Sequence, residues 1–424
     1  MILHIEDNDV RNLLFKGEFG LERENLRATK GGRLAKTRHP FHDHPHITMD
    51  FAENQVEINT PVFSSAEEVI GSLKSYSDEI NRILASRDEK EYLWPFSNPP
   101  YIEGEDDIPI AQFFGKLEEK TRYREYLSER YGRYKMTFCG VHVNYSFAEE
   151  LLQADYRASQ AFNKCDFSNY KNLFYLSLAE RVVKYCWLIT ALTAASPLVD
   201  KSFIDHGHQG GSVFTGMASM RCGENGYWNS FTPIFEYDSM EAYTNRIKYY
   251  VDMGLIISPS ELYYPVRLKP RGDYSLSQLL EEGVNHIELR LFDLNPLCEG
   301  GVDVRDIKFV QLLLIYLAGV EDALLEPKDQ IQAIQNMKNA ACYDHNNIKI
   351  VMPDQSVIPL AEAGREVIAK MREFFEDCIG KSEAIETILS FEEEKLIDQN
   401  KSYAHILREK LGDEYVKNGC KMMQ

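Results

Sequence analysis

The chain has few of the features that mark nucleic-acid-binding or membrane-surface proteins. Its 47 lysines and arginines are outnumbered by 66 aspartates and glutamates, which gives a formal net charge of −19 over 424 residues. Nucleic acids and anionic lipid surfaces are bound through basic faces, so this composition argues against both partners. It does not exclude small anionic ligands, because a few arginines or metal ions can reverse the charge locally.

Long hydrophobic runs, a basic leader and paired cysteines are also lacking. The longest apolar stretch, Tyr185 to Ala195, is well short of the ~20 residues that span a bilayer. The first residues turn acidic at Glu6 and Asp7, without the basic segment of a secretory signal. The 8 cysteines form no C-x-x-C pair, which disfavours a zinc or disulfide framework. We therefore expect a cytoplasmic protein that does not enter membranes.

Hydrophobic patterning divides the chain near residue 303. Before that point, short alternating runs predict strands at 17–27, 46–60, 134–147, 214–222, 263–269 and 285–292. Helical periodicity predicts helices at 66–86, 168–195, 239–253, 304–325, 360–379, 383–395 and 402–411. We expect an α+β fold, with an antiparallel sheet and helices over residues 1–303 and a mostly helical part over 304–424 packed on it.

Three of these strands place polar residues two positions apart. They contain the pairs Glu22 and Glu24, His142 and Asn144, and Glu288 and Arg290, with apolar residues on either side of the last two pairs. Residues i and i+2 of a strand point to the same face. Each strand therefore presents two polar groups to one side of the predicted sheet.

If the strands share one sheet, a single face collects five carboxylates and one imidazole. These predicted metal ligands are Glu22, Glu24, Asp50, Glu57, His142 and Glu288. Five packed carboxylates repel one another unless cations hold them. Oxygen ligands with one imidazole suit Mg²⁺ or Mn²⁺ better than zinc. Arg290 and Arg221 could then grip a phosphate or carboxylate, which together suggests ATP-dependent phosphoryl transfer.

Two other motifs are weaker signals. Any one E-x-E or E-x-R pair alone is typical of a solvated surface ion pair, so only the joint pattern carries weight. The histidines between His39 and His46 lie in a proline-containing segment without regular spacing, which we interpret as a substrate-access loop or plain surface. Gly380-Lys-Ser382 follows Phe375 where a phosphate loop needs glycine, so it is not a nucleotide-binding loop.

Five ordered segments resemble the glutamate–cysteine ligase family of the bacterial type. They are Phe19–Arg27, Asp50–Glu53, Cys139–Asn144, Glu261–Arg267 and Ile287–Arg290. The resemblance runs from about residue 18 to residue 303 and implies a fold like that of glutamine synthetase, a curved antiparallel sheet forming a bowl with helices outside. It also implies an activity: ATP phosphorylates the γ-carboxylate of L-glutamate, and the amine of L-cysteine attacks the acyl phosphate in the first step of glutathione synthesis.

The resemblance also implies residue roles. The family's metal ligands fall on the same six residues that share the sheet face. Arg290 matches the arginine that holds glutamate, and Arg221 matches the arginine near the transferred phosphate. The family's aromatic cysteine pocket falls on Tyr123, Tyr227, Tyr263, Leu127 and Phe51. We add Asn144 to the predicted substrate-binding residues.

Two alternatives stay open at this point. One is a ligase that joins glutamate to a different amine, and the other is an inactive relative with a regulatory role, although none of the six predicted ligands is missing. The sequence ends where fused bifunctional enzymes continue into an ATP-grasp domain, so we do not expect a second ligation. Glutamate, cysteine and ATP are the expected small-molecule partners, and the oligomeric state is open, with a monomer possible.

Overall fold

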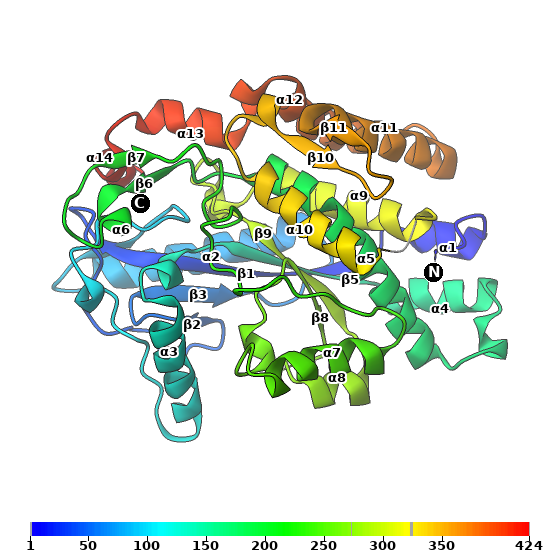
Figure 1. Ribbon diagram of the computed structural model, residues 1–424, viewed down its shortest axis with the longest axis horizontal. Coiled ribbons are helices and arrows are strands. Elements are labelled where there is room, and N and C mark those ends of the chain that lie inside the picture. The colour runs from blue at the N-terminus through cyan, green and yellow to red at the C-terminus, as the bar shows by residue number, and fades with distance from the viewer. Residues whose placement is uncertain (1, 273, 323–324, 424) are drawn as a thin grey trace.

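An antiparallel sheet forms the centre of the computed structural model, which describes residues 2–272, 274–322 and 325–423 (Figure 1). Its strands run in the order β2-β3-β1-β5-β9-β8, and β4 pairs with β1 off this path. The strands of this sheet are β1 (Gly17–Thr29), β2 (Ile47–Met49), β3 (Gln55–Asn59), β4 (Glu91–Leu93), β5 (Val141–Phe147), β8 (Val266–Lys269) and β9 (His286–Phe292). The expected α+β fold with an antiparallel sheet and surrounding helices is confirmed.

Fourteen α-helices, eight short 3₁₀ helices and two small two-stranded sheets complete the described structure. The helices are α1 (Asn8–Leu13), α2 (Ala66–Ala85), α3 (Glu118–Tyr131), α4 (Glu149–Ala158), α5 (Phe167–Thr193), α6 (Lys201–Ile204), α7 (Met240–Asp252), α8 (Leu276–Glu282), α9 (Val304–Gly319), α10 (Pro327–Ala340), α11 (Leu360–Ile379), α12 (Glu383–Ile397), α13 (Tyr403–Leu411) and α14 (Tyr415–Cys420). The small sheets pair β6 (Leu198–Asp200) with β7 (Ser212–Phe214) and β10 (Lys349–Val351) with β11 (Val357–Pro359).

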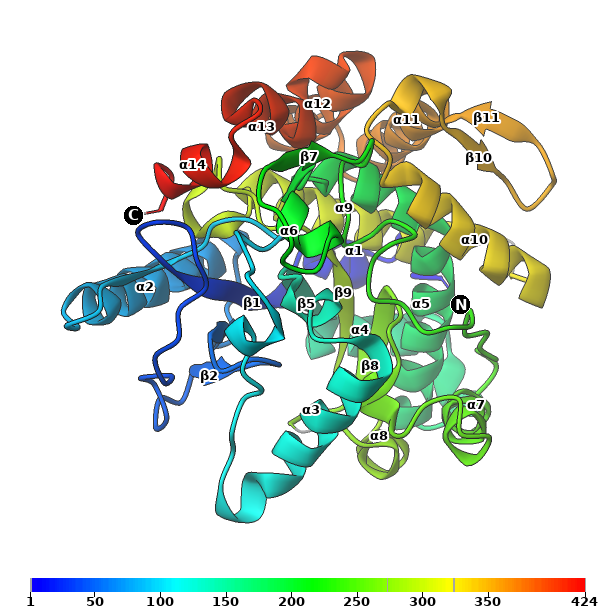
Figure 2. The same cartoon turned by 60° about the vertical axis from the view of Figure 1, so that its left-hand side comes forward.

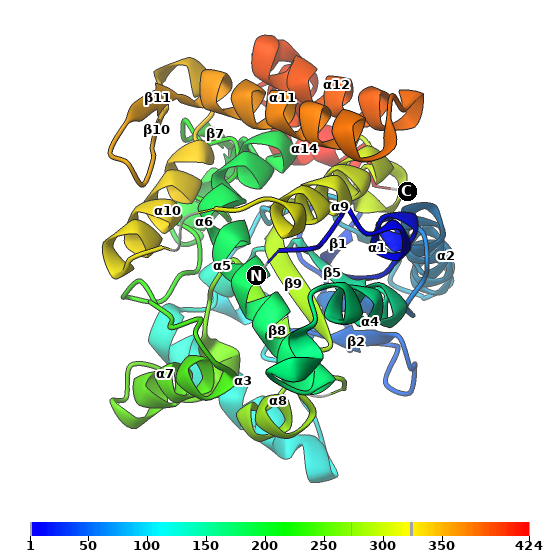
Figure 3. The ribbon, with the colours of Figure 1, turned by 90° about the vertical axis from the view of Figure 1, so that its right-hand side faces the viewer.

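The long helix α5 is buried along most of its length and packs on β8 and β9. Asp166 caps it by accepting the backbone N–H of Asn169, and the helix ends at Thr193, before Pro197. Helices α9 and α10 pack against α5, and α11 and α12 form the outermost layer on this side (Figure 3). One face of the sheet is thereby covered, so the polar face is the one available for chemistry.

Helix α2 begins as the sequence predicts. The backbone N–H of Glu68 donates to Ser65 Oγ at 3.3 Å, and the Ser65 hydroxyl donates to the Glu68 carboxylate at 2.9 Å. This exchange between the cap and the third residue satisfies a free N–H at the helix start. The helix packs on β1 and β4.

Several predicted elements differ from the structure. The predicted strand 214–222 is wrong: only Ser212–Phe214 pairs as β7, and glycines at 216, 223 and 226 break the following run into turns. The predicted helix 304–325 ends at Gly319, and residues 323 and 324 lie outside the described part. The region after residue 303 is not wholly helical, because it contains the β10–β11 hairpin.

The division at residue 303 stays a prediction. One cluster of buried hydrophobic residues includes side chains from both sides of it, among them Leu289 and Leu313. In the described part of the chain, no helix has the length and apolar character needed to span a bilayer.

Candidate active site

A cavity of about 230 Å³ opens on the polar face of the sheet. All six predicted metal ligands line it, together with Arg290 and the five residues of the predicted cysteine pocket. The lining residues are Glu22, Glu24, Asp50, Phe51, Glu57, Tyr123, Arg124, Leu127, Met136, Phe138, His142, Tyr227, Ser260, Tyr263, Arg267, Lys269, Glu288 and Arg290. Residues far apart in the sequence therefore meet in one place.

Strand register explains how the acids come together. Glu22 of β1 lies directly opposite His142 of β5, and Glu24 lies opposite Glu57 of β3. A β-bulge shifts the β5–β9 register between Val141 and Val143, at the position of His142. Bulges re-aim a side chain, so the imidazole lies near groups from β9 as well as β1.

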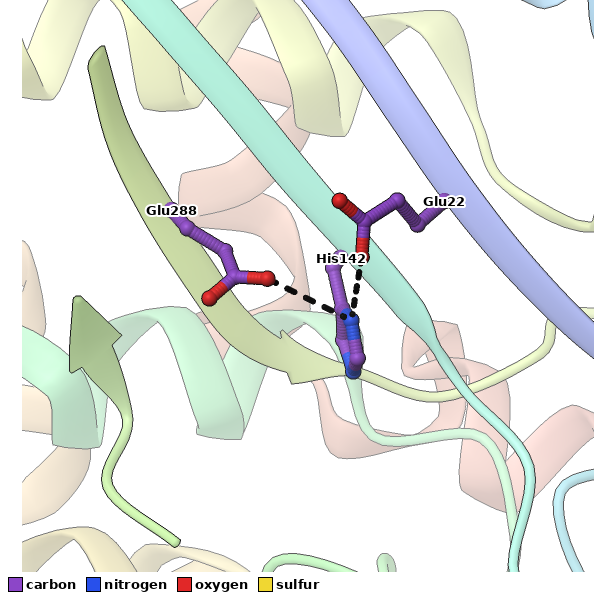
Figure 4. Close-up of side chains that lie close together, drawn as sticks. All are labelled: Glu22, His142 and Glu288. Atoms are coloured by element: carbon purple, nitrogen blue, oxygen red, sulfur yellow. Dashed lines mark hydrogen bonds and ion pairs between the residues drawn. The ribbon is translucent and has the colours of Figure 1, made fainter. Parts of the chain in front are cut away.

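Glu22, His142 and Glu288 form a tight group (Figure 4). His142 Nδ1 lies 3.1 Å from Glu22 Oε2 and 3.7 Å from Glu288 Oε1. One ligand atom from each of the three residues lies within 4.8 Å of the others, the only such group of His, Cys, Asp or Glu in the described residues that could hold a metal ion. Burial and Arg290 lower the pKa of His142 to about 4, so the imidazole is neutral near pH 7 and able to act as a ligand.

The acids at the β1–β3 side of the cavity have a different electrostatic setting. Burial raises the pKa of Glu24 well above its usual range, and Asp50 adds to the effect. Burial and Asp50 also raise the pKa of Glu57 to about 8. These carboxylates are short of positive charge when no ion is bound.

Unsatisfied buried atoms test whether a cation fits among the six predicted metal ligands. We call these residues the acidic ring: Glu22, Glu24, Asp50, Glu57, His142 and Glu288. His142 Nε2, Glu24 Oε2 and Glu288 Oε2 are buried and have no hydrogen-bond partner among the described residues. His142 Nε2 lies 3.9 Å from Glu24 Oε1, so the imidazole stands between the two groups of acids. Unpaired buried acceptors are costly, and hard oxygen donors with one imidazole match a divalent ion such as Mg²⁺ or Mn²⁺. The residues present therefore fit a bound divalent cation.

Arg290 lines the cavity, and Arg221 lies beside it in an adjoining recess with Tyr227 and Tyr263. Arg290 donates to Glu288 Oε1 at 3.1 Å, and Arg221 donates to the Arg290 backbone carbonyl at 2.8 Å. A Cβ at Gly140 would lie 2.5 Å from the Arg221 guanidinium. Glycine at this position therefore makes room for the Arg221 side chain.

Aromatic side chains form the other end of the cavity. The rings of Tyr227 and Tyr263 meet edge to face with centroids 4.9 Å apart. Tyr123 and Leu127 come from α3, which projects from the body of the molecule (Figure 2), and Phe51 comes from the loop between β2 and β3. This end of the cavity is lined by apolar surface with phenol groups, which suits a small ligand with a soft atom and polar ends.

Asn144 is placed differently from the other predicted substrate-binding residues. It does not line the cavity, and its side-chain N–H donates to Glu22 Oε1 at 3.2 Å. Its contact in the structure is therefore with a predicted metal ligand.

Sequence reasoning missed four polar residues in the cavity wall, Arg124, Ser260, Arg267 and Lys269. Arg267 and Lys269 lie two apart on β8, the same spacing that identified the acids, so the signal was available. Lys269 Nζ lies 3.7 Å from Glu288 Oε1. These cations offset part of the acidic charge on the β8–β9 side.

A hydrogen-bond network behind the aromatic pocket was also missed. Glu261 is fully buried and accepts from the Tyr131 hydroxyl at 2.6 Å and from the Ile257 backbone N–H at 2.6 Å, and it pairs with Arg130 at 3.0 Å. Asn229 accepts the Tyr263 backbone N–H at 2.9 Å and donates to the Glu261 carbonyl at 2.9 Å.

The network joins segments that carry pocket residues. Arg130 and Tyr131 belong to α3, Glu261 ends the short helix Pro259–Glu261 before Tyr263, and Asn229 follows Tyr227. Because these contacts link distant parts of the chain, no local pattern could have identified them.

The histidine segment does not converge on the cavity. His39 is buried, while His46 contacts the Asn59 carbonyl at 2.9 Å through Nδ1. None of the four histidines lines the cavity.

Comparisons with known proteins identify the family of the chain. The family described as glutamate–cysteine ligase matches residues 2–255 and 251–340. The glutathione biosynthesis bifunctional protein of Listeria monocytogenes EGD-e is similar, with 35% identity over 420 residues covering 96% of this chain and 54% of the relative. The protein of the same name from Clostridium perfringens is 33% identical over 407 residues, covering 92% and 51%. The chain thus spans about half the length of these curated relatives.

Two solved structures have a similar fold. A bifunctional glutathione synthetase from Pasteurella multocida superposes with a TM-score of 0.84 at 27% identity, covering 100% of this chain and 54% of that one. A glutamate–cysteine ligase from Francisella tularensis in complex with AMP gives a TM-score of 0.83 at 22% identity, covering 96% and 87%. The second comparison concerns the fold alone.

Proposed function

Because the chain belongs to the glutamate–cysteine ligase family, we propose that it joins the γ-carboxylate of L-glutamate to the amino group of L-cysteine, with ATP converted to ADP and phosphate. This is the first step of glutathione biosynthesis. The observation that carries the proposal is the cavity in which the buried acids and His142, with unpartnered ligand atoms, lie beside Arg290 and an aromatic pocket.

The reaction has two steps, and neither needs a protein nucleophile. An oxygen of the glutamate γ-carboxylate attacks the γ-phosphorus of ATP, and ADP leaves. The cysteine amine then attacks the acyl carbon, phosphate leaves with the C–O bond electrons, and the amine loses a proton to form the amide. Catalysis of this kind depends mainly on positioning and charge neutralisation.

Glu22, Glu24, Asp50, Glu57, His142 and Glu288 would hold the divalent ions. When bound, Mg²⁺ or Mn²⁺ supplies positive charge that neutralises the phosphate oxygens and the acids together. The acids would place this charge on the sheet face that contains Arg290. His142 remains neutral near pH 7, as a ligand requires.

The two arginines would act on the reacting groups. Arg290 lines the cavity and would bind a glutamate carboxylate through its planar guanidinium. Arg221 is buried beside it and would stabilise the charge that develops as the phosphoryl group moves. The backbone carbonyl of Arg290 accepts a hydrogen bond from the Arg221 side chain, so the Arg221 guanidinium is held on the strand that carries Arg290.

The aromatic end would select the acceptor amine. Tyr123, Tyr227 and Tyr263 surround a small space in which ring faces can contact a thiol and hydroxyls can orient an amine or carboxylate. Leu127 and Phe51 close the apolar side. This shape favours cysteine over long or strongly charged amines.

Nucleotide assays test the proposal. Without hydroxylamine, we expect sustained ADP release only when glutamate, cysteine and Mg²⁺ are present together. When hydroxylamine replaces cysteine, it should trap the acyl phosphate as a hydroxamate, again with release of ADP. ADP release that does not depend on glutamate would contradict the proposal. Failure to bind Mg-ATP by calorimetry would instead favour an inactive regulatory relative.

We further propose a cytoplasmic location. All 8 cysteines are free in the structure, which is typical of proteins in reducing compartments. Glutamate, cysteine and ATP are then the proposed small-molecule partners.

A further inference from the structure

A second cavity lies against the other face of β1. It measures about 280 Å³ and shares no residue with the candidate active site. Its walls come from β1, α2, the segment around Leu93 and the turn before α9. The lining residues are Arg23, Asn25, Lys74, Ser77, Asp78, Asn81, Leu93, Pro95, Leu294, Pro296, Leu297, Cys298, Glu299, Gly300, Gly301 and Met422.

Arg23 is a buried cation in this cavity wall. Its side chain is only 4% exposed, and its guanidinium donates to the Gly300 carbonyl at 2.7 Å and to Ser77 Oγ at 2.7 Å. Arg23 Nε has no partner, and no carboxylate of the described residues forms an ion pair with this side chain. A buried guanidinium without an anion is costly, so the site lacks a negative group.

Two amide oxygens in the same wall lack donors. Asn25 is 5% exposed and donates its side-chain N–H to the Trp94 carbonyl at 3.0 Å, while its Oδ1 has no partner among the described residues. Asn81 Oδ1 is also buried without a partner. Buried acceptors are normally satisfied. These two oxygens therefore lack donors, while Arg23 lacks an anion.

Helix α2 directs a polar stripe to this cavity. Lys74, Ser77, Asp78 and Asn81 follow the i, i+3, i+4, i+7 spacing of one helix face and all line the cavity. At the rim, Lys74 pairs with Glu299, and Asp78 presents an exposed carboxylate. The cavity thus has a cation at its buried wall and a carboxylate at its rim.

We propose that this cavity binds a small amino acid, with the carboxylate on Arg23 and the ammonium on the amide oxygens of Asn25 and Asn81. The ligand supplies the missing anion and the missing donors at once. Leu93, Pro95 and Leu294 leave an apolar wall for a small side chain. Arg23 lies between Glu22 and Glu24 on β1. A ligand bound in the second cavity would therefore contact the strand that holds two predicted metal ligands.

Methionine methyl NMR tests this inference without depending on the proposed activity. Met422 lines the second cavity, and Met136 lines the candidate active site. The full chain is labelled with ¹³C at the methionine methyl groups, and both signals are assigned by substitution with leucine. Glycine, acetate and inorganic phosphate are then titrated separately. We expect glycine to shift the Met422 signal saturably and acetate, which lacks the ammonium, to bind roughly tenfold more weakly.

Variants of the cavity wall decide the assignment. Arg23→Met and Asn81→Leu are expected to weaken the effect of glycine on Met422 by about tenfold or more. Arg82→Leu, at an exposed position on the same helix, serves as the matched control and should leave it unchanged. Asn81→Leu removes no hydrogen bond within the described structure and so keeps the test informative if Arg23→Met does not fold.

Three results would overturn the proposal. They are no saturable shift of Met422 with glycine, an unchanged glycine response in the Asn81→Leu protein, and a response to phosphate without one to glycine.

Discussion

The two sides of the acidic ring differ in how the chain neutralises them. On the β8–β9 side, Glu288 lies beside Lys269 and Arg290, and although burial opposes it, these cations hold the pKa of Glu288 well below its usual range. On the β1–β3 side, burial and Asp50 raise the pKa of Glu57 to about 8. Identical residue types on one sheet face therefore have opposite protonation behaviour, and the β1–β3 side depends more on an external cation.

Glu22 lies between these extremes. Burial and Glu288 act to raise its pKa, but the hydrogen bond with His142 and the charge of Lys269 bring it below the usual value. The imidazole thus lies between acids neutralised by nearby cations and acids whose pKa values are raised.

The largest expected effect follows from removing the acid at the neutralised side. Glu288→Gln should lower ligase activity by roughly a thousandfold, because it removes a predicted metal ligand and leaves Lys269 and Arg290 without their carboxylate. Steady-state ADP release measures this effect. Glu282→Gln, an exposed position at the end of α8, is the control. Full activity of Glu288→Gln would remove this residue from the metal site.

A smaller effect is expected at Glu261, a buried acid satisfied by hydrogen bonds and Arg130. Glu261→Gln should raise KM for cysteine about tenfold, because losing charged hydrogen bonds loosens the pocket wall. KM for glutamate and the Mg²⁺ dependence should stay unchanged, which separates this acid from the ring. Glu241→Gln, exposed on α7, is the control. Equal changes in KM for cysteine, in KM for glutamate and in the Mg²⁺ dependence would show a general structural role instead.

Substitutions on the two sides of the acidic ring should also have opposite effects on the stability of the protein. In EDTA above pH 8, Glu57→Gln is expected to raise the melting temperature by a few degrees, because it removes an uncompensated buried carboxylate. Glu288→Gln should lower it under the same conditions, since two cations lose their partner. Thermal unfolding of both proteins measures the difference. Changes in melting temperature of the same sign in both proteins would contradict the proposed electrostatic difference between the two sides.

The smallest expected effect is on the pH dependence of stability. The pKa of Glu57 is about 8 in the folded state and near 4.5 when unfolded, so the folded state holds more protons in between. The contribution of Glu57, measured as the stability of the metal-free protein relative to that of Glu57→Gln, should therefore fall as pH rises from about 5 to about 8. Divalent ions should counter this fall and stabilise the protein more at pH 8 than at pH 6, which melting curves with and without Mg²⁺ can measure. A constant metal effect would contradict the assigned titration.

Local sequence patterns predicted the sheet and the face that carries the acids, because strand parity depends only on backbone geometry. Predicting which residues share this face required no knowledge of the strand register, as the pairs Glu22 and Glu24 and Glu288 and Arg290 illustrate. The predicted strand 214–222 failed because Gly216, with a φ of 80°, breaks the extended run after β7. The contacts of Glu261 and Asn229 depend on tertiary structure and leave no periodic signal.

An assay with several acceptor amines tests the proposed ligation of glutamate to cysteine most directly. The protein is given ATP, glutamate and Mg²⁺ with cysteine or with one of several other amino acids, and ADP release is measured. We predict that cysteine gives the highest kcat/KM and that chelation of Mg²⁺ abolishes the reaction. A different amine that performs as well as cysteine, or ADP release that persists in EDTA, would contradict it.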